Sequence, residues 1–348
     1  MNKKFIKIGN IKIGTAFPPL VIAEIGINHN GSIERAIKIA DSAIKSGAKI
    51  IKHQTHVVDD EMSEEAKKIK PGNSNTNIYD IIKKCSLNEE DEYKLMKYIQ
   101  SKKRIFISTP FSRKAVDRLE KFNVPAYKIG SGECNNYLLV EYIARKKKPI
   151  ILSTGMNSVK TIKPATKILE KFRIPYALLH CTNIYPTPAK LVRLHDITTL
   201  KKKFPKAVVG LSDHTSNIYS ALASVALGAS IIEKHFVDSK KFKGPDISAS
   251  MDKNELRDLI YGSSQIFLAK GSNNKNPIKE EQKTINFAFA SAVATKNIKV
   301  GEKLSLNNFF LMRPGNGDFN IKNYKRLIGK RVKKPIKYNT QIKKNYLK

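Results

Sequence analysis

The sequence has no tryptophan, only three cysteines and few acidic side chains, and each shortage narrows what the protein can be. Cys85, Cys134 and Cys181 are odd in number and widely spaced, which argues against a disulfide framework or a cysteine zinc site and predicts reduced core residues. No apolar run reaches the roughly 18 residues of a membrane helix, and the amino terminus lacks the apolar stretch of a signal peptide. We therefore expect a cytoplasmic protein that does not bind a membrane.

The shortage of acidic residues leaves 64 Lys and Arg side chains against 30 Asp and Glu, a formal net charge of +34. Residues 284–348 alone contribute +13. Such a charge is typical of a nucleic-acid binder, but an anionic substrate or a lysine-rich composition gives the same balance. Lys outnumbers Arg 53 to 11, which weakens the nucleic-acid interpretation because bidentate recognition of bases and phosphates favours Arg. Composition alone leaves all three interpretations open.

Apolar segments of strand length recur along the first 270 residues, with amphipathic segments of helix length between them. A short hairpin around Asn10 comes first. The predicted strands are Leu20–Ile25, Ala48–Gln54, Ile105–Thr109, Ala126–Gly130, Pro149–Thr154, Tyr176–Cys181, Ala207–Ser212 and Ser230–Phe236. The predicted helices include Ile33–Ser46, Arg113–Phe122, Val159–Phe172 and Ile218–Leu227.

Eight strand-then-helix repeats are typical of a (β/α)8 barrel, which we favour over a doubly wound sheet with similar local patterns. Residues 1–270 are assigned to this α/β barrel with its amino-terminal hairpin. The polar stretch 271–283 is predicted to be a linker. Residues 284–348 are rich in Gly and Pro turns and predict a small separate domain with a marginal core of its own.

Polar residues end nearly every predicted strand. In a barrel the carboxyl ends of the strands form the functional face, so these residues are expected to converge there. In chain order they are Glu24, Lys52, Gln54, Thr109, Lys128, Ser131, Glu133, Ser153, Asn183, Tyr185, Ser212, His214, Glu233 and His235. A single Lys or Ser at a strand end is more often solvated than functional, but residues that converge from eight strands favour a site.

Two lysines and three hydroxyls among these residues suit an anionic substrate. Lys52 and Lys128, with Ser131, Ser153, Ser212 and the backbone amides of the Gly130–Gly132 turn, supply the positive charge and the donors that a phosphate requires. One of the lysines could instead form a Schiff base, as in an aldolase, if burial lowered its pKa. The sequence leaves both possibilities open.

His214 and His235 end neighbouring strands, and two neutral imidazoles with open positions suit a divalent metal such as Mn²⁺. The alternative is that both are hydrogen-bonded core histidines. Glu233, on the same strand face as His235, is a candidate for orienting a metal-bound water. Glu24 and Asp246 are candidate acid/base carboxylates, with surface salt bridges as the alternative. His29 lies in a loop on the same face, where a functional and a structural role are equally supported.

Ten segments in order closely resemble the bacterial N-acetylneuraminate (sialic acid) synthase family. They are IAEIGINHNG, IIKHQTH, STPFS, YKIGSGECNN, ILSTGMNS, LLHCTNIYPTP, GLSDHT, IEKHF, GPDISASM and RPGNGDF. The resemblance runs from about Leu20 to the carboxyl terminus. It implies a (β/α)8 barrel followed by a small antifreeze-like (SAF) domain, and a domain-swapped homodimer in which that domain covers the partner's barrel mouth.

The resemblance also implies the reaction, which is condensation of phosphoenolpyruvate with N-acetylmannosamine and release of phosphate. In the family, histidines matching His214 and His235 hold Mn²⁺ or Mg²⁺, and Glu24 matches a glutamate that orients or deprotonates water. The positions that match phosphoenolpyruvate contacts are Lys52, Thr109, Lys128, Ser131, Ser153 and Ser212. Gln54, Asn183, Tyr185 and Asp246 match positions near the sugar, and Arg313 matches an arginine that reaches the substrate N-acetyl group across the dimer.

One departure from the wider family is KHQTH, because many members are expected to have aromatic residues at His53 and His56. A subset of sialic acid synthases carries the histidine form. Close relatives with nearly the same motifs make legionaminic or pseudaminic acid from diacetamido-trideoxy sugars, so the amino sugar stays open. The alternative from a different class, a basic nucleic-acid-binding protein, rests on charge alone, and we expect no nucleic-acid partner.

Overall fold

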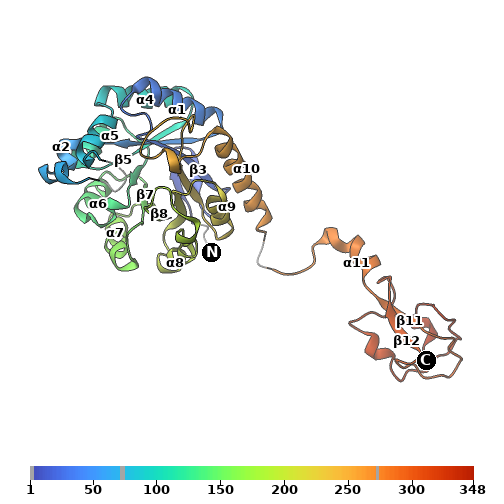
Figure 1. The fold of residues 1–348 in the computed structure, drawn as a ribbon. Helices are drawn as coiled ribbons and strands as arrows, with labels where there is room; N and C mark the ends of the chain where they lie inside the picture. The colour runs from blue at the N-terminus through green and yellow to red at the C-terminus, as the bar shows by residue number, and fades with distance from the viewer. Residues whose placement is uncertain (1–3, 71–74, 272–273) are drawn as a thin grey trace. The chain divides into compact units, whose positions relative to one another are not determined.

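The computed structural model describes residues 4–70, 75–271 and 274–348 and divides the chain into two compact units, Met1–Gly271 and Ser272–Lys348. The first unit holds a closed barrel of eight parallel strands with helices around it (Figure 1). The barrel strands are β3 (Leu20–Gly26), β4 (Ile50–Thr55), β5 (Ile105–Pro110), β6 (Tyr127–Ile129), β7 (Ile150–Ser153), β8 (Tyr176–Cys181), β9 (Val208–Asp213) and β10 (Ile231–His235). The predicted (β/α)8 barrel is confirmed, and pairing of β10 with β3 excludes the open doubly wound sheet.

Helices follow the strands and form the outer layer of the barrel. They are α1 (Ile33–Lys45), α2 (Val58–Glu61), α3 (Ile78–Cys85), α4 (Glu89–Ser101), α5 (Arg113–Lys121), α6 (Tyr137–Ala144), α7 (Val159–Lys171), α8 (Asp196–Lys203), α9 (Tyr219–Ala226) and α10 (Lys253–Ala269). Caps fix where several begin: the Ser32 side chain accepts a hydrogen bond from the Arg35 amide at α1, and Asp252 and Glu255 form a capping box at α10. The four predicted helices end within two residues of these bounds.

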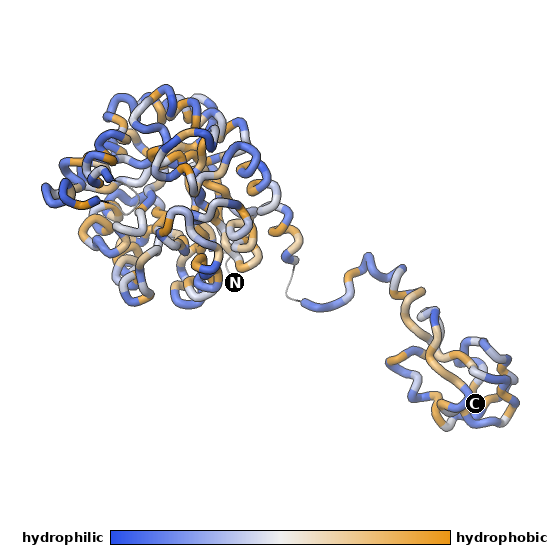
Figure 2. Tube along the Cα trace, viewed as in Figure 1, coloured by the Kyte–Doolittle hydropathy of each residue, from blue (hydrophilic) through white to orange (hydrophobic). Residues whose placement is uncertain are grey.

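The amino-terminal hairpin, β1 (Ile6–Ile8) and β2 (Ile11–Ile13), closes one end of the barrel, and it was predicted from the sequence. Its three buried isoleucines, Ile6, Ile8 and Ile13, pack in one cluster with interior barrel residues such as Ile22 and Ile50. Apolar side chains fill the barrel interior at this end. In Figure 2 the hydrophobic segments of the first unit lie mainly inside it and the hydrophilic ones mainly at its periphery. The interior is therefore dry at the amino ends of the strands, and the polar strand-end residues occupy the other end.

Strand alternation sorts each strand's residues between the barrel interior and the helix layer. On β4, Ile50 belongs to the interior cluster, whereas Ile51 belongs to the larger core between strands and helices. The same period of two turns Lys52 inward and His53 outward. Consecutive side chains of one strand therefore lie alternately in the barrel interior and in the layer between strands and helices.

The second unit is built around the antiparallel pair β11 (Ser291–Ala294) and β12 (Phe309–Met312). It has its own small core, which includes Phe309, Leu327 and Val332. Helix α11 (Gln282–Ala288) precedes the pair, and its first residues fall inside the stretch 271–283 that was predicted to be a linker. None of the helices in the described part of the chain is long and apolar enough to cross a membrane.

Candidate active site

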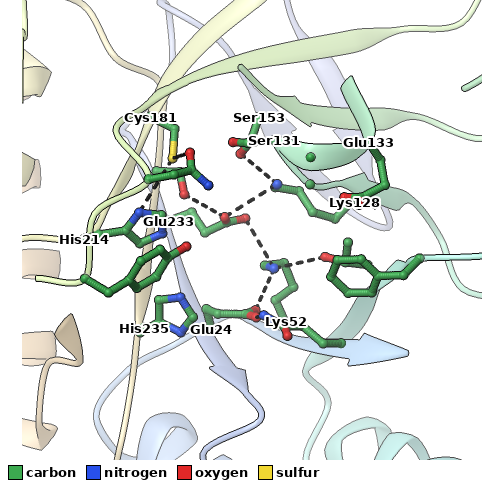
Figure 3. Close-up of a pocket in the computed structure, with 18 residues that line it drawn as sticks. Glu24, Lys52, Lys128, Ser131, Glu133, Ser153, Cys181, His214, Glu233 and His235 are labelled. Atoms are coloured by element: carbon green, nitrogen blue, oxygen red, sulfur yellow. Dashed lines mark hydrogen bonds and ion pairs between the residues drawn. The ribbon is translucent and has the colours of Figure 1, made fainter. Parts of the chain in front are cut away.

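A polar cavity opens at the carboxyl end of the barrel, and almost all predicted site residues line it. The lining includes Glu24, Lys52, Gln54, Thr109, Lys128, Ser131, Glu133, Ser153, Asn183, Tyr185, Ser212, His214, Glu233 and His235. They come from all eight strands or from the loops that follow them. The convergence predicted from the strand ends therefore occurs. Figure 3 shows the two lysines on one side, the two histidines on the other and Glu233 between them.

Lys52 and Lys128 are buried and share the Glu233 carboxylate. Lys52 Nζ lies 2.8 Å from Glu24 Oε2 and 3.9 Å from Glu233 Oε2, while Lys128 Nζ lies 3.6 Å from Glu233 Oε1. Ser212 Oγ donates to Glu233 Oε1 at 3.0 Å. The sequence suggested that Glu233 orients a metal-bound water, whereas its charged contacts within 4 Å are the two lysines.

Burial and these carboxylates have opposite effects on the pKa values of the two lysines. Burial disfavours the charged form of Lys52, but the charges of Glu233 and Glu24 outweigh it and raise the pKa of Lys52 above its usual value. For Lys128 burial dominates and lowers the pKa, with Glu233 offsetting only part of the effect. Burial also acts to raise the pKa of Glu233, but Lys128 and Lys52 outweigh it and lower that pKa. Lys52 thus offers a fixed positive charge.

Hydroxyl groups surround the ammonium groups of the lysines. Lys52 Nζ donates to Thr109 Oγ1 at 3.1 Å, and Lys128 Nζ donates to Ser153 Oγ at 2.8 Å. Ser131, directly before the 3₁₀ turn Gly132–Asn135, accepts from the Gly155 amide at 3.0 Å. Two ammonium groups and several hydroxyls on one wall can bind an anion that carries more than one negative charge.

His214 and His235 project from neighbouring strands, with ring centroids 5.4 Å apart. Burial lowers the pKa of each to about 4, so both rings are neutral near pH 7. His214 Nδ1 donates to the Thr182 carbonyl at 3.1 Å, which leaves the lone pair on Nε2. His235 Nδ1 is buried and makes no hydrogen bond to a described residue.

These properties fit a divalent metal, because neutral imidazole nitrogens without another partner are good ligands. Within residues 4–70, 75–271 and 274–348, no group of three or more His, Cys, Asp or Glu side chains is arranged to hold an ion. The protein would therefore supply two imidazoles and leave the other positions to substrate or water.

Asp246 stands beside this pair, outside the cavity lining. Its Oδ2 lies 3.6 Å from His235 Nδ1, and burial raises the pKa of Asp246 to about 6. Tyr185 stacks on His214 with ring centroids 4.1 Å apart. The predicted sugar contacts thus cluster near the histidines.

Two other predicted sugar contacts are held by their neighbours. Gln54 Nε2 donates to Glu24 Oε1 at 2.9 Å. Gly155 makes room for Asn183, because a Cβ at Gly155 would lie 1.8 Å from Asn183 Oδ1. Glu133 is half-buried at the rim, where burial raises its pKa.

Arg313 belongs to the second unit, where it is exposed directly after β12. The role of Arg313 at the site therefore stays a prediction.

Sequence reasoning missed two residues of the lining, Cys181 and Phe111. Cys181 was assigned to the core, but its Sγ lies 3.7 Å from His214 Nδ1 and 3.3 Å from Asn183 Oδ1. Burial raises the pKa of its thiol to about 11, so the thiol is uncharged near pH 7. Its place at the last residue of β8 is the signal that could have identified it.

His29 and His53 do not line the cavity. His29 Nδ1 accepts from the Gly31 amide at 3.2 Å, so its Nε2 carries the hydrogen that points at His53 Nε2, 3.2 Å away. His53 Nδ1 then donates to Glu92 Oε1 at 3.0 Å. Burial and the neighbouring His53 lower the pKa of His29 to about 3. Both rings belong to a hydrogen-bonded network between the barrel and its helices.

Comparison with known proteins places this site in a family. Residues 39–275 match the NeuB family, and residues 289–348 match the SAF domain. The chain is 38% identical to N,N'-diacetyllegionaminic acid synthase of Campylobacter jejuni over 93% of this chain and 98% of that protein. It is 34% identical to pseudaminic acid synthase of the same species, over 97% and 98%.

The chain is also similar to a solved structure of a sialic acid synthetase. N-acetylneuraminic acid (sialic acid) synthetase of Leptospira borgpetersenii, crystallised with citrate, is 31% identical. It superposes with a TM-score of 0.75 over 81% of this chain and 95% of that one.

Proposed function

This chain belongs to the NeuB family of sialic, legionaminic and pseudaminic acid synthases, and we propose that it condenses phosphoenolpyruvate with N-acetylmannosamine to give N-acetylneuraminate and phosphate. The observation that carries the proposal is the division of one cavity into two walls. Two buried lysines with hydroxyl partners form one wall, and two neutral histidines form the other. The first wall suits a trianion, and the second suits an aldehyde that must be made electrophilic.

Phosphoenolpyruvate would bind on the lysine wall. Lys128 with Ser131 and Ser153 provides donors for one anionic group, and Lys52 with Thr109 for the other. Ser212 holds the Glu233 carboxylate, which lies between the two ammonium groups and offsets their mutual repulsion. The phosphate and the carboxylate of the substrate are thereby fixed with the methylene carbon free to react.

The sugar would bind between this wall and the histidines, in reach of Gln54, Asn183 and Tyr185. His214 and His235 would hold the divalent ion, which when bound supplies Lewis-acid polarisation of the sugar aldehyde. Asp246, next to His235, is assigned as the acid beside the aldehyde oxygen. Arg313 is assigned to the N-acetyl group.

Bond making then follows from the two bound substrates. The methylene carbon of phosphoenolpyruvate attacks the aldehyde carbon, forming the carbon–carbon bond and leaving positive charge on the phosphate-bearing carbon. Water adds to that carbon while Glu24 takes its proton. Asp246 gives its proton to the former aldehyde oxygen. As the carbon–oxygen bond to phosphate breaks, the added hydroxyl passes its proton to the leaving phosphate and becomes the ketone, while the proton on Glu24 returns to Asp246 through solvent. The products are the 2-keto acid and inorganic phosphate. Lys52 Nζ lies 2.8 Å from Glu24 Oε2 and holds the carboxylate in place.

The test is a comparison of two sugars with purified protein, phosphoenolpyruvate and Mn²⁺. We expect phosphate and a 2-keto acid in equal amounts, with kcat/KM at least about 10-fold higher for N-acetylmannosamine than for 2,4-diacetamido-trideoxymannose. EDTA should abolish both products, and added Mn²⁺ should restore them. Absence of phosphate release with either sugar would overturn the proposal. Irreversible inactivation by borohydride with substrate bound would indicate the lysine Schiff base instead.

A second candidate is a legionaminic-type synthase, which uses the diacetamido sugar. It is favoured by the 38% identity to the Campylobacter jejuni enzyme over nearly the whole length of both chains. The same assay separates the two, because each candidate predicts the opposite order of kcat/KM.

We also propose the homodimer in which Arg313 completes the partner's site. Mixing Glu24→Gln protein with Arg313→Ala protein tests it, since a swapped mixed dimer contains one site with an intact barrel and an intact Arg313. Activity of the mixture should exceed the sum of the two separate proteins several-fold. Simple additivity after subunit exchange would contradict the swapped arrangement.

A further inference from the structure

His56 follows β4 and is buried at the edge of the active-site cavity. Its ring stacks on Phe111, with centroids 4.3 Å apart and planes inclined by 9°. Nδ1 lies 2.8 Å from Glu61 Oε2, and Nε2 lies 3.3 Å from Gln54 Oε1. The ring thus bridges a carboxylate of α2 and an amide that lines the cavity.

Both neighbours of the ring are hydrogen-bond acceptors. Glu61 offers a carboxylate oxygen, and the Gln54 amide turns its oxygen to His56 because its nitrogen donates to Glu24 Oε1 at 2.9 Å. A neutral imidazole has only one N–H and would leave one acceptor facing a lone pair. The network is complete only when both ring nitrogens carry hydrogen, which makes His56 an imidazolium cation.

The charged groups around His56 agree with a cation. Glu61 is in direct contact. The charges of Glu133, in the 3₁₀ turn Gly132–Asn135, and of Asp246, directly before the 3₁₀ turn Ile247–Ala249, also interact with His56. Carboxylates from three different segments therefore favour a positive charge on the ring.

The histidine pair His29 and His53 does not share this arrangement. At His29 and His53 each ring donates one hydrogen and accepts one, so two neutral rings satisfy every contact. In the described part of the chain, His56 contacts two acceptors and no donor. The difference lies in the Gln54 amide, which is committed to Glu24.

We propose that His56, held as a cation between Glu61 and Gln54, is a positioning residue that locks the Gln54 amide toward Glu24. This rests on the proposed function, in which Glu24 takes a proton from water and Gln54 contacts the sugar. Without a donor at His56 the amide can turn, which would place the Gln54 oxygen against the Glu24 carboxylate. Catalysis should therefore fall when His56 is replaced by a residue that does not bridge Glu61 and Gln54.

The kinetic test compares kcat/KM for the sugar in three variants at one pH. Glu61→Gln removes the carboxylate that holds His56 Nδ1, so it should lower kcat/KM for the sugar severalfold. His56→Gln should lose about 10-fold in kcat/KM for the sugar, with KM for phosphoenolpyruvate little changed. His53→Gln, from the outward face of the same strand, is the control and should keep the wild-type values. Wild-type kcat/KM for the sugar in both Glu61→Gln and His56→Gln would overturn the proposal.

A spectroscopic test decides the charge without any turnover. The protein is labelled with ¹⁵N-histidine, and the His56 signals are identified by their loss in His56→Gln. At pH 7 both ring nitrogens should show imidazolium shifts, whereas His29 and His53 should show neutral tautomers. A neutral His56 at pH 7 would refute the assignment. Absence of synthase activity would count against the proposed function alone, because the spectrum reports on His56 in either case.

Discussion

The two faces of strand β4 carry two separate polar networks. Inward, Lys52 and Gln54 meet Glu24 in the cavity. Outward, His53 and Thr55 meet Glu92 of α4, and Arg118 of α5 donates to its other oxygen at 3.1 Å. Alternation along one strand thus separates the site from a structural network only one residue away.

The inner network leaves polar atoms unmatched, and the outer carboxylate does not. Among the described residues, the buried atoms without a hydrogen bond include Glu233 Oε2 and His235 Nδ1 at the cavity and Arg118 Nε on the outer face. Both oxygens of Glu92 accept hydrogen bonds. Unsatisfied buried groups cost stability, so they are expected where a ligand will complete them. Inner changes should therefore alter the reaction, and outer changes should alter folding.

The largest effect is expected for Glu24→Gln on the inner face. The amide cannot take a proton from water, so kcat should fall by about 10² to 10⁴-fold. The free energy of unfolding should change by at most about 1 kcal/mol, because Lys52 keeps Glu233 and Thr109 as partners. Steady-state phosphate release and urea unfolding measure the two quantities. Glu34→Gln, an exposed carboxylate in the first turn of α1, is the control that should change neither.

On the outer face, Glu92→Gln should lower the free energy of unfolding and leave the reaction nearly unchanged. Burial acts to raise the pKa of Glu92, but hydrogen bonds from His53 and Thr55 and the charge of Arg118 outweigh it and lower that pKa below 4.5. Removing the charge breaks a buried ion pair and should cost about 3 kcal/mol of unfolding free energy. kcat/KM of the folded protein should stay within about twofold. A large kinetic defect with unchanged stability would show that the outer face also takes part in the reaction.

The pH dependence of that cost has a definite sign. Because the folded pKa of Glu92 lies below the ordinary value of 4.5, its stabilisation is present above pH 4.5 and is lost as pH falls through the folded pKa. The gap in unfolding free energy between wild type and Glu92→Gln should therefore narrow on acidification below pH 4.5. Glu89→Gln, a half-exposed neighbour on the same helix, should show a gap below about 0.5 kcal/mol at every pH.

The smallest expected effects come from adjacent hydroxyls of β5. Thr109 faces inward and accepts from Lys52, whereas Ser108 faces outward and lies 2.7 Å from Thr55 Oγ1. Thr109→Val should raise KM for phosphoenolpyruvate about 10-fold, since a hydrogen bond to a charged group is lost. Ser108→Ala should leave KM unchanged and cost about 1 kcal/mol of unfolding free energy. Equal KM values in both variants would contradict the assignment of faces.

The sequence predicted the inner face better than the outer one, for a physical reason. Strand alternation and the rule that barrel strands end at the functional face suffice to place Lys52, Gln54 and Glu233 in one cavity. Glu92 comes 39 residues after its partner His53, and Arg118 comes 26 residues after its partner Glu92. No local sequence pattern joins residues so far apart. The contact of His56 with Glu61 is close in sequence, but its charge depends on how the Gln54 amide is turned.

Carbon–oxygen cleavage of phosphoenolpyruvate at the inner site can be tested by isotope labelling. Phosphoenolpyruvate carrying ¹⁸O in the bridging position is turned over with N-acetylmannosamine and Mn²⁺, and the released phosphate is analysed by mass spectrometry. If the carbon–oxygen bond breaks, the bridging ¹⁸O appears in the phosphate and not in the 2-keto acid. Phosphate without the label, or a 2-keto acid that retains it, would show that the phosphorus–oxygen bond breaks instead.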